Sequence, residues 1–225
     1  MITSQHAGPA RAQNQILSYA LFLREYVRNP RATASVCPSS PALSRRMAES
    51  IDFRRARTIV ELGAGTGAVT RAILERLPRT ALLFAVDNNQ SFVDHLAERF
   101  PDRRLVPICG QAERLAETLG SKGVERADVI VSSLGFTTML PEERGAILNN
   151  IVACLQPDGI LIQYQYHVSR WQWLTVAGRT HWPFEAEELL RTCFRSVVTK
   201  DVILNIPPAR VFVCSKPVHR KRESR

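Results

Sequence analysis

The sequence predicts an α/β domain in which helices cover both faces of a mostly parallel sheet. Two observations predict this fold class. From Thr58 onward, short apolar and β-branched runs alternate with segments of helical periodicity, and this unit repeats five times. The first run leads into the glycine-rich stretch "ELGAGTGAVT", which opens the first helix. Because strand–helix–strand units connect through right-handed crossovers, the repeats place these strands parallel to one another.

The first two strand–helix repeats have the clearest patterns. Residues 58–62 are a β-branched run that ends in glycines, and residues 69–77 follow it with helical spacing. Residues 81–87 are apolar up to their last position, as expected of a strand covered on both faces. Residues 92–100 then form the second helix.

The third strand is weaker, and the last repeats resemble the first. Residues 104–108 include Pro107, which has no N–H for the ladder, and the next helix, residues 112–120, ends at a glycine. The helix of the following unit opens with a proline and two glutamates, which favour a first turn. We expect strand, helix and strand at residues 127–133, 141–155 and 159–166.

The pattern changes after Trp171. Residues 185–194 form a last helix, and residues 196–214 read as two strands joined at a pair of prolines. We therefore expect the domain to end in a β-hairpin.

The totals fit one domain with appendages. The chain has 225 residues, 45% of them hydrophobic, and a net charge of +9. Residues 1–57 carry an excess of six positive charges and residues 216–225 an excess of four, whereas the body is nearly neutral. We expect an N-terminal helical segment (1–57), a catalytic domain (58–215) and a basic tail (216–225). Positive ends around a neutral body indicate an anionic partner, either a nucleic acid or a membrane surface.

Several classes of protein are excluded at this stage. The five cysteines are scattered, odd in number and without a C-x-x-C spacing, which is typical of reduced thiols and of neither a disulfide framework nor a zinc site. No signal peptide is visible, and the longest apolar run near the start is far below the roughly 20 residues that span a bilayer. We expect a cytoplasmic protein with no metal.

The glycine stretch and two acids predict the cofactor. Gly63, Gly65 and Gly67 allow a tight bend against which a ligand can lie, but their G-x-G-x-G spacing differs from that of dinucleotide and P-loop sites. Glu61 precedes the loop, where it would repel a pyrophosphate and attract a cation. Asp87 ends the second strand, a position suited to two ribose hydroxyls. A ribose together with a positive centre indicates S-adenosylmethionine.

At this point the chain resembles the class I methyltransferases, and in particular the bacterial phospholipid N-methyltransferases. The resemblance covers residues 22–213, most of the chain. Its most specific parts are the segments "FLREYVRNPRATASVCPSSPALSRRMA" (22–48) and "NIPPARVFV" (205–213); "VIVSSLGFTTMLPEERGAIL" and "GILIQYQY" are also similar. The resemblance implies a Rossmann-like sheet of seven mostly parallel strands with the last strand antiparallel, after an N-terminal amphipathic helical segment. It also implies N-methylation of phosphatidylethanolamine toward phosphatidylcholine.

The resemblance also suggests further cofactor contacts and shows two departures. Where the family places an acid against the adenine, this chain has Gln111, whose carbonyl can still accept from the adenine amine. Where the family has a proline after the fourth strand, this chain has Gly135, which loosens the loop beside the substrate and bears on headgroup specificity. Asn88 and Ser132 complete the cofactor contacts that we expect.

The substrate pocket is expected at the carboxyl ends of the fourth and fifth strands. Methyl transfer requires a neutral amine, although an amine like that of lysine has a pKa of about 10. Tyr166, which matches a tyrosine of the family, would orient the amine, with Ser133 beside it, and His167 is a further candidate to take the proton. Phe136 and Tyr164 would face the headgroup. Because alternation places Tyr164 and Tyr166 on one face, at least one of them could instead be part of the core.

Two segments are candidates for membrane contact. The stretch "ILSYALFLREYVRNPR" has an apolar helical face followed by basic residues, and Tyr19, Arg24 and Arg28 would meet the lipid surface. The stretch "SRWQWLTVAGRTHWPF" supplies Trp171 as an interfacial residue and Arg170 and Arg179 as ligands of a lipid phosphate. We expect a protein peripheral on the inner face of the cytoplasmic membrane. A lid that packs across the sheet is the alternative for the first stretch.

Two rival functions keep the fold. Another aminolipid, such as an ornithine lipid, would change only the substrate. An rRNA adenine N6-dimethyltransferase would have a similar glycine loop, but it carries an Asn-Leu-Pro-Tyr type motif where this chain has "SLGF", and an RNA-binding domain for which the sequence shows no counterpart after Val213. We therefore expect an aminophospholipid substrate and no nucleic acid. The oligomeric state is left open.

Overall fold

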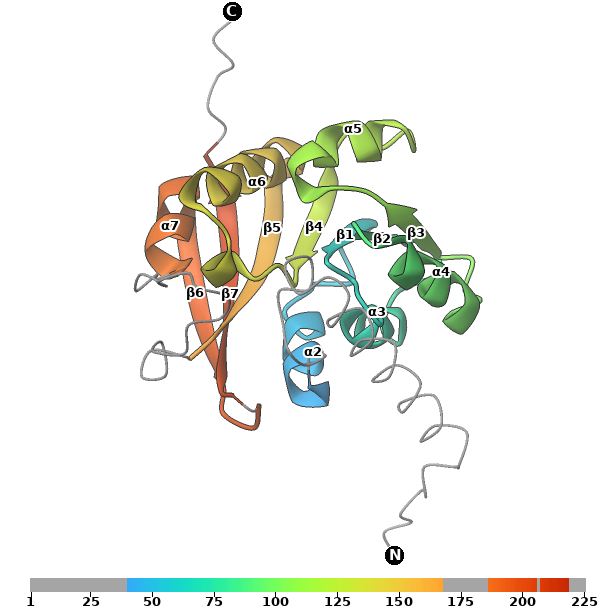
Figure 1. Ribbon diagram of the computed structural model, residues 1–225, viewed down its shortest axis with the longest axis horizontal. Coiled ribbons are helices and arrows are strands. Elements are labelled where there is room, and N and C mark those ends of the chain that lie inside the picture. The colour runs from blue at the N-terminus through green and yellow to red at the C-terminus, as the bar shows by residue number, and fades with distance from the viewer. Residues whose placement is uncertain (1–39, 168–185, 206, 219–225) are drawn as a thin grey trace, which may run out of the picture.

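The computed structural model (Figure 1) describes residues 40–167, 186–205 and 207–218. Within these ranges it contains a seven-stranded sheet in the order β3-β2-β1-β4-β5-β7-β6. The predicted Rossmann-like sheet is therefore confirmed. The strands are β1 (Thr58–Leu62), β2 (Leu82–Asp87), β3 (Leu105–Cys109), β4 (Ala127–Ser132), β5 (Leu155–Tyr166), β6 (Phe194–Val202) and β7 (Ala209–Pro217).

Strands β1 to β6 all point in the same direction, and β7 alone points in the opposite direction. Strand β1 lies between β2 and β4. The strands that follow β1 are added first on one side of it (β2, β3) and then on the other (β4, β5), so the glycine stretch leaves the sheet at the topological switch point. Strand β7 is antiparallel to β5 on one side and to β6 on the other. Strand β6 therefore points in the same direction as β1 to β5, and the β6–β7 turn lies at their carboxyl edge.

Helices cover both faces of the sheet. One face carries α2 (Pro41–Ala48), α3 (Ala68–Leu74) and α4 (Gln90–Arg99), and the other carries α5 (Leu115–Gly120), α6 (Pro141–Cys154) and α7 (Ala186–Cys193) (Figure 1). Two short 3-10 turns, η1 (Ala112–Arg114) and η2 (Phe136–Thr138), follow β3 and β4. Two hydrophobic clusters separated by the sheet form the core.

Helix α2 packs into the core. Leu43 and Met47 are fully buried in the same cluster as Ile59 of β1 and Ile73 of α3. Ser40 begins the helix, and its hydroxyl accepts a hydrogen bond from the N–H of Leu43 (3.2 Å). The described part of the expected N-terminal segment thus belongs to the folded body, while the division into three parts stays a prediction.

Strand β5 differs from the prediction. It begins at Leu155, immediately after α6, whereas the sequence predicted a helix up to residue 155 and a strand from residue 159. The pairing with β4 shifts register between Ala127 and Val129, which accommodates Pro157 and Asp158 outside the regular ladder.

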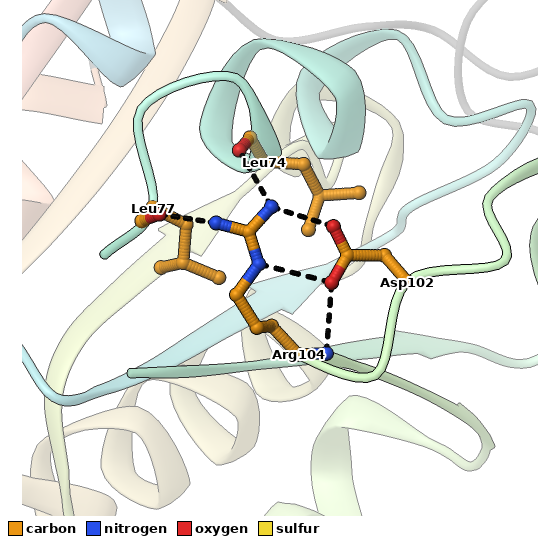
Figure 2. A network of polar contacts seen from close by, with 4 residues as sticks. All are labelled: Leu74, Leu77, Asp102 and Arg104. Carbon is orange, nitrogen blue, oxygen red and sulfur yellow. Dashed lines mark hydrogen bonds and ion pairs between the residues drawn. The ribbon is translucent and has the colours of Figure 1, made fainter. Parts of the chain in front are cut away.

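An ion pair in the loop before β3 is linked to the end of α3 at the amino edge, opposite the candidate site (Figure 2). The Arg104 guanidinium contacts both carboxylate oxygens of Asp102, at 2.9 and 2.5 Å, and donates to the backbone carbonyls of Leu74, the last residue of α3, and of Leu77, just beyond it. Carbonyls at a helix end lack partners within the helix, and Arg104 satisfies that of Leu74. The hydrogen bonds from the side chain and the backbone N–H of Arg104 hold the pKa of Asp102 at about 2.

Candidate functional site

The glycine loop joins β1 to α3 in a left-handed backbone conformation. Gly63, Gly65 and Gly67 have φ of +72°, +52° and +82°, where other residues are strained. The N–H of Gly63 donates to the carbonyl of Val86 (2.9 Å), which fastens the loop to β2. The positive φ angles alone require glycine at these three positions, so they explain the shape of the loop and do not identify a ligand.

Two of these glycines meet different surroundings. A Cβ at Gly67 would lie 2.5 Å from Phe100 Cε2 and 2.7 Å from Leu96 Cδ2, so this glycine permits α3 to pack against α4. A Cβ at Gly65 would have no atom of the described residues within 4 Å. Packing within the described part of the chain therefore does not account for Gly65, and we expect a ligand to approach the backbone there.

Asp87 is fixed at the end of β2. Its Oδ2 accepts from the N–H of Gly65 (2.8 Å) and its Oδ1 accepts from the N–H of Asn89 (3.0 Å). Burial raises the pKa of this carboxyl, and the backbone hydrogen bonds partly oppose the rise. Asp87 thus orients the glycine loop and keeps lone pairs on both oxygens for further donors.

Glu61 is fully buried in β1 beneath the loop. Its Oε2 accepts from the Thr70 hydroxyl of α3 (2.7 Å), and within the described ranges Oε1 has no hydrogen-bond partner. Burial, with a smaller contribution from the charge of Asp87, raises the pKa of Glu61 to about 8. A buried carboxylate oxygen without a partner is costly, so the position favours a ligand that brings a donor or a cation.

These residues fit the expected cofactor. The left-handed loop at Gly65, the Glu61 oxygen without a partner among the described residues, and the carboxylate of Asp87 lie close together at the carboxyl edge. Asn88 and Gln111 are exposed at the ends of β2 and β3, and the N–H of Gly110 donates to the carbonyl of Asp87 (2.9 Å), which places Gln111 next to this carboxylate. A nucleoside held by Asp87 would have Asn88 and Gln111 beside it.

Ser132 and Ser133 end β4 beside the glycine loop. The N–H of Ser133 donates to the carbonyl of Leu62 (2.8 Å), and the buried Ser132 hydroxyl accepts weakly from the N–H of Leu134 (3.4 Å). The buried Ser133 Oγ has no partner among the described residues. It is therefore available to a polar group that enters from the carboxyl edge.

Gln163 is a site residue that the sequence analysis missed. It lies opposite Ser132 in the β4–β5 register and is fully buried. Its side-chain amide donates to the carbonyls of Leu134 (2.9 Å) and Tyr164 (2.8 Å), while its Oε1 has no partner within the described part of the chain. Since Leu134 also contacts Gly63, Gln163 supports both loops of the site. The signal was available: a glutamine stands inside the otherwise apolar run "ILIQY".

The two tyrosines of β5 form a pair on the α2 face of the sheet. Their ring centroids are 5.2 Å apart at an interplanar angle of 71°, an edge-to-face contact. Tyr164 is a member of the core cluster at 8% exposure, whereas Tyr166 is half-buried and packs against that cluster. The structure thus favours a packing role for Tyr164 and leaves Tyr166 at the edge, where the role predicted for it requires it to be.

His167 and Phe136 lie away from this pair. The His167 Nε2 is 3.0 Å from Asp201 Oδ1 on β6, and alternation along β5 places His167 on the face opposite Tyr166. Phe136 is 3% exposed and packs in the cluster under α5, α6 and α7. Their roles as proton acceptor and headgroup contact stay predictions. The predicted lipid contacts outside the described residues are Tyr19, Arg24, Arg28, Arg170, Trp171 and Arg179.

Two features are absent from the described ranges. These residues contain no group of three His, Cys, Asp or Glu side chains that could hold a metal ion. None of the helices in the same ranges combines the length and the apolar character needed to cross a bilayer.

Comparison with known proteins adds to this geometry. Residues 60–161, from β1 into β5, match the profile of a family described as "Methyltransferase domain". The chain is 29% identical over 197 residues to the ornithine lipid N-methyltransferase of Singulisphaera acidiphila, an alignment that covers 87% of this chain and 95% of that protein.

A shorter match and a solved structure complete the comparison. A stretch of 92 residues is 34% identical to ribosomal RNA small subunit methyltransferase A of Laribacter hongkongensis, but it covers 41% of this chain and 33% of that protein. The 1,6-didemethyltoxoflavin-N1-methyltransferase of Burkholderia thailandensis superimposes with a TM-score of 0.58 over 96% of this chain and 93% of that one, at 20% identity. At this identity the likeness shows the fold alone.

Proposed function

Because this chain is a class I S-adenosylmethionine-dependent methyltransferase, we propose that it methylates the amino headgroup of an aminolipid held in a membrane. The observation that carries the proposal is the alignment with the ornithine lipid N-methyltransferase, which extends over 95% of that protein. An alignment of this extent includes the substrate side of the sheet as well as the glycine loop, which all enzymes of the class share.

The residues at the carboxyl edge support an amine as the acceptor. When bound, S-adenosylmethionine supplies an electrophilic methyl group that a lone pair attacks. The protein must therefore orient the amine and accept the hydrogens that it carries. The Tyr166 oxygen and the buried Ser133 Oγ provide acceptors that can hold a neutral amine, and the Tyr166 ring can face the cation that forms on methylation.

Removal of the proton is the second requirement. An alkylamine with a pKa near 10 is mostly protonated at neutral pH, so the site must bind the minor neutral form or accept the proton. Tyr166 lies on the same face of the sheet as Glu61 and Asp87, whereas His167 lies on the other face beside Asp201. We therefore assign the orientation of the amine to Tyr166 and give His167 no direct part.

The aminolipid is proposed to be an ornithine lipid first and phosphatidylethanolamine second. A relative that aligns with most of the chain is an ornithine lipid N-methyltransferase. The segments "NIPPARVFV" and "VIVSSLGF" resemble those of phosphatidylethanolamine N-methyltransferases. Both lipids present a primary amine at the bilayer surface. The protein is accordingly proposed to work on the inner face of the cytoplasmic membrane without spanning it, with its basic ends near anionic lipid.

One experiment tests the proposal. The purified chain is incubated with methyl-labelled S-adenosylmethionine and vesicles that contain an ornithine lipid, phosphatidylethanolamine or phosphatidylglycerol alone. Lipid extracts are then examined by mass spectrometry for species that carry one, two or three added methyl groups. Label in an aminolipid supports the proposal and identifies the headgroup. Label only in 16S ribosomal RNA offered in parallel would refute it.

A further inference from the structure

The turn between β6 and β7 exposes apolar side chains at its apex. Ile203 is 80% exposed and Leu204 is 87% exposed, the two highest values among the large hydrophobic residues of the described ranges. Pro207 and Pro208 are also exposed. Single exposed apolar residues are common on soluble proteins, but four gathered at one projecting turn form a patch. We call Ile203, Leu204, Pro207 and Pro208 the β6–β7 tip.

The tip is held in place by a buried base. Val202 and Ala209 pair across the last rung of the hairpin and are 6% and 0% exposed. Asn205 is 2% exposed, and its side-chain amide donates to the carbonyl of Pro207 (2.6 Å). The side chain of Asn205 thus faces inward and fastens the turn, while Ile203 and Leu204 face solvent. Ile203 and Leu204 are thus exposed on a turn whose base is buried and hydrogen-bonded.

The tip lies at the edge of the sheet that carries the candidate site. Strand β6 points in the same direction as β1 and β4, so the turn after it emerges where the glycine loop and Ser133 emerge. Ala209 at its base pairs with both Val202 and Tyr166. In Figure 1 the turn projects at the lower edge of the molecule, beyond the ends of β4 and β5. The apex of the turn therefore lies beyond the rung that includes the tyrosine we assign to the amine.

The charges around the tip suit a lipid surface. Residues 202–209 include no charged residue. The nearest acid, Asp201, is 2.8 Å from the Arg210 Nε and 3.0 Å from the His167 Nε2, so its charge is matched by neighbours. Lys200 adds one cation at the base of the hairpin, so residues 200–210 carry a net charge of +1. An uncharged apex above a cationic rung suits an element that inserts between lipid headgroups.

We propose that the β6–β7 tip inserts into the interfacial region of a phospholipid bilayer and directs the carboxyl edge of the sheet toward its lipid substrate. The inference rests on the proposed function for the choice of a bilayer as the partner. It adds a membrane contact that is separate from the N-terminal stretch and from residues 169–184. With the tip inserted, the carboxyl edge faces the headgroup layer, and an amine reaches Tyr166 without its lipid leaving the membrane.

The test replaces the apex and leaves the base intact. The variant I203S/L204S removes two exposed side chains, and L82S removes an exposed leucine (42% exposed) at the start of β2, on the opposite edge of the sheet. Partition onto vesicles of phosphatidylcholine and phosphatidylglycerol is measured by sedimentation, with no aminolipid present, so that binding is independent of catalysis. Thermal unfolding, size-exclusion chromatography and calorimetric titration with S-adenosylmethionine are recorded for each protein.

We expect I203S/L204S to partition onto the vesicles at least about tenfold more weakly than the wild type, because it lacks the two apolar side chains that the bilayer would bury. L82S should bind to the vesicles as the wild type does, with a small fall in unfolding temperature because its leucine is partly buried in β2. The unfolding temperature and the affinity for S-adenosylmethionine should be unchanged in I203S/L204S. The apparent KM for aminolipid in vesicles should rise in I203S/L204S, with no change for the same lipid in detergent micelles.

The outcomes separate the two proposals. Equal vesicle binding by wild type and I203S/L204S overturns the inference, even if the wild type methylates an aminolipid. A fall in unfolding temperature shows that the tip packs against this chain, and a change in oligomeric state shows that it packs against a second copy; either result overturns the inference. Weaker vesicle binding by the variant supports the inference even if no lipid receives a methyl group, in which case the proposed function alone fails.

Discussion

Replacing Gly65 with alanine separates the cofactor site from the stability of the fold. Gly65 has φ of +52°, and no atom of the described residues lies within 4 Å of an added Cβ, so the expected cost to the fold is that of a left-handed alanine. Strain of roughly 1–2 kcal/mol, reduced by the lower entropy of the unfolded alanine chain, leaves a loss of about 1 kcal/mol. For a chain of this size that loss lowers the unfolding temperature by about 2–4 °C. The new methyl group occupies the space next to the loop, so the affinity for S-adenosylmethionine should fall at least about tenfold.

Gly123 is the matched control. It has φ of +72° and, like Gly65, no atom of the described part of the chain within 4 Å of an added Cβ, but it lies in the loop between α5 and β4 at the opposite edge. G123A should therefore lose the same stability as G65A and keep full affinity. G67A should lose more stability than either, since its Cβ would meet Phe100 and Leu96 and add about 1–3 kcal/mol of overpacking.

Urea unfolding and calorimetric titration measure the two quantities for each variant. The reasoning is refuted if G65A binds S-adenosylmethionine as tightly as G123A does, because the loop would then not form the cofactor site. It is also refuted if G67A is as stable as G65A, because the contacts with Phe100 and Leu96 would then not constrain the helix packing.

Three further predictions follow from charges and hydroxyls of the structure. Burial raises the pKa of Glu61 to about 8, so in the absence of ligand the free energy of unfolding should fall as pH rises from the usual carboxyl range toward 8; E61Q should remove this fall, on the order of 4 kcal/mol by urea unfolding. Hydrogen bonds from Arg104 lower the pKa of Asp102 to about 2, so D102N should cost about 1 kcal/mol at neutral pH, and its difference from the wild type should disappear as pH falls through 2. Y166F should lower kcat on an aminolipid by about tenfold or more with an unchanged KM for S-adenosylmethionine, whereas Y164F should resemble the wild type; equal activity in Y166F would remove the phenol oxygen from the mechanism.

The central part of the fold was predictable because its signals are local. The strand of residues 58–62 was predicted with the bounds that the structure gives, since a β-branched run is followed directly by glycines. The strand ending at Asp87 was within one residue for the same kind of reason. The positions of the cofactor acids follow from these boundaries, because a residue at a strand end in a parallel sheet lies at the shared carboxyl edge.

The parts that were missed depend on contacts between distant segments. Nothing near Gln163 in the sequence shows that its amide reaches the carbonyl of Leu134, 29 positions earlier in the chain. The core position of Leu43 in α2 depends on packing against β1 and α3. Because these contacts join distant parts of the chain, the sequence alone predicted an N-terminal segment separate from the domain. The exposure of Ile203 and Leu204 was likewise hidden, because an apolar run before a turn is typical of a buried strand.

The sheet itself sorts the candidate residues into two groups. Alternation along β1 and β5 places Glu61 and Tyr166 on the face that α2 and α3 cover, and the Thr70 bond and the shared hydrophobic cluster confirm this side. Gln163 and His167 face the other way, toward the loop after β4 and toward Asp201. A ligand held by the glycine loop on the α3 side can therefore meet Tyr166 directly, while Gln163 acts through the loop that it supports. The same alternation that could have made Tyr166 an ordinary core residue is what places its side chain on the cofactor's side of the sheet.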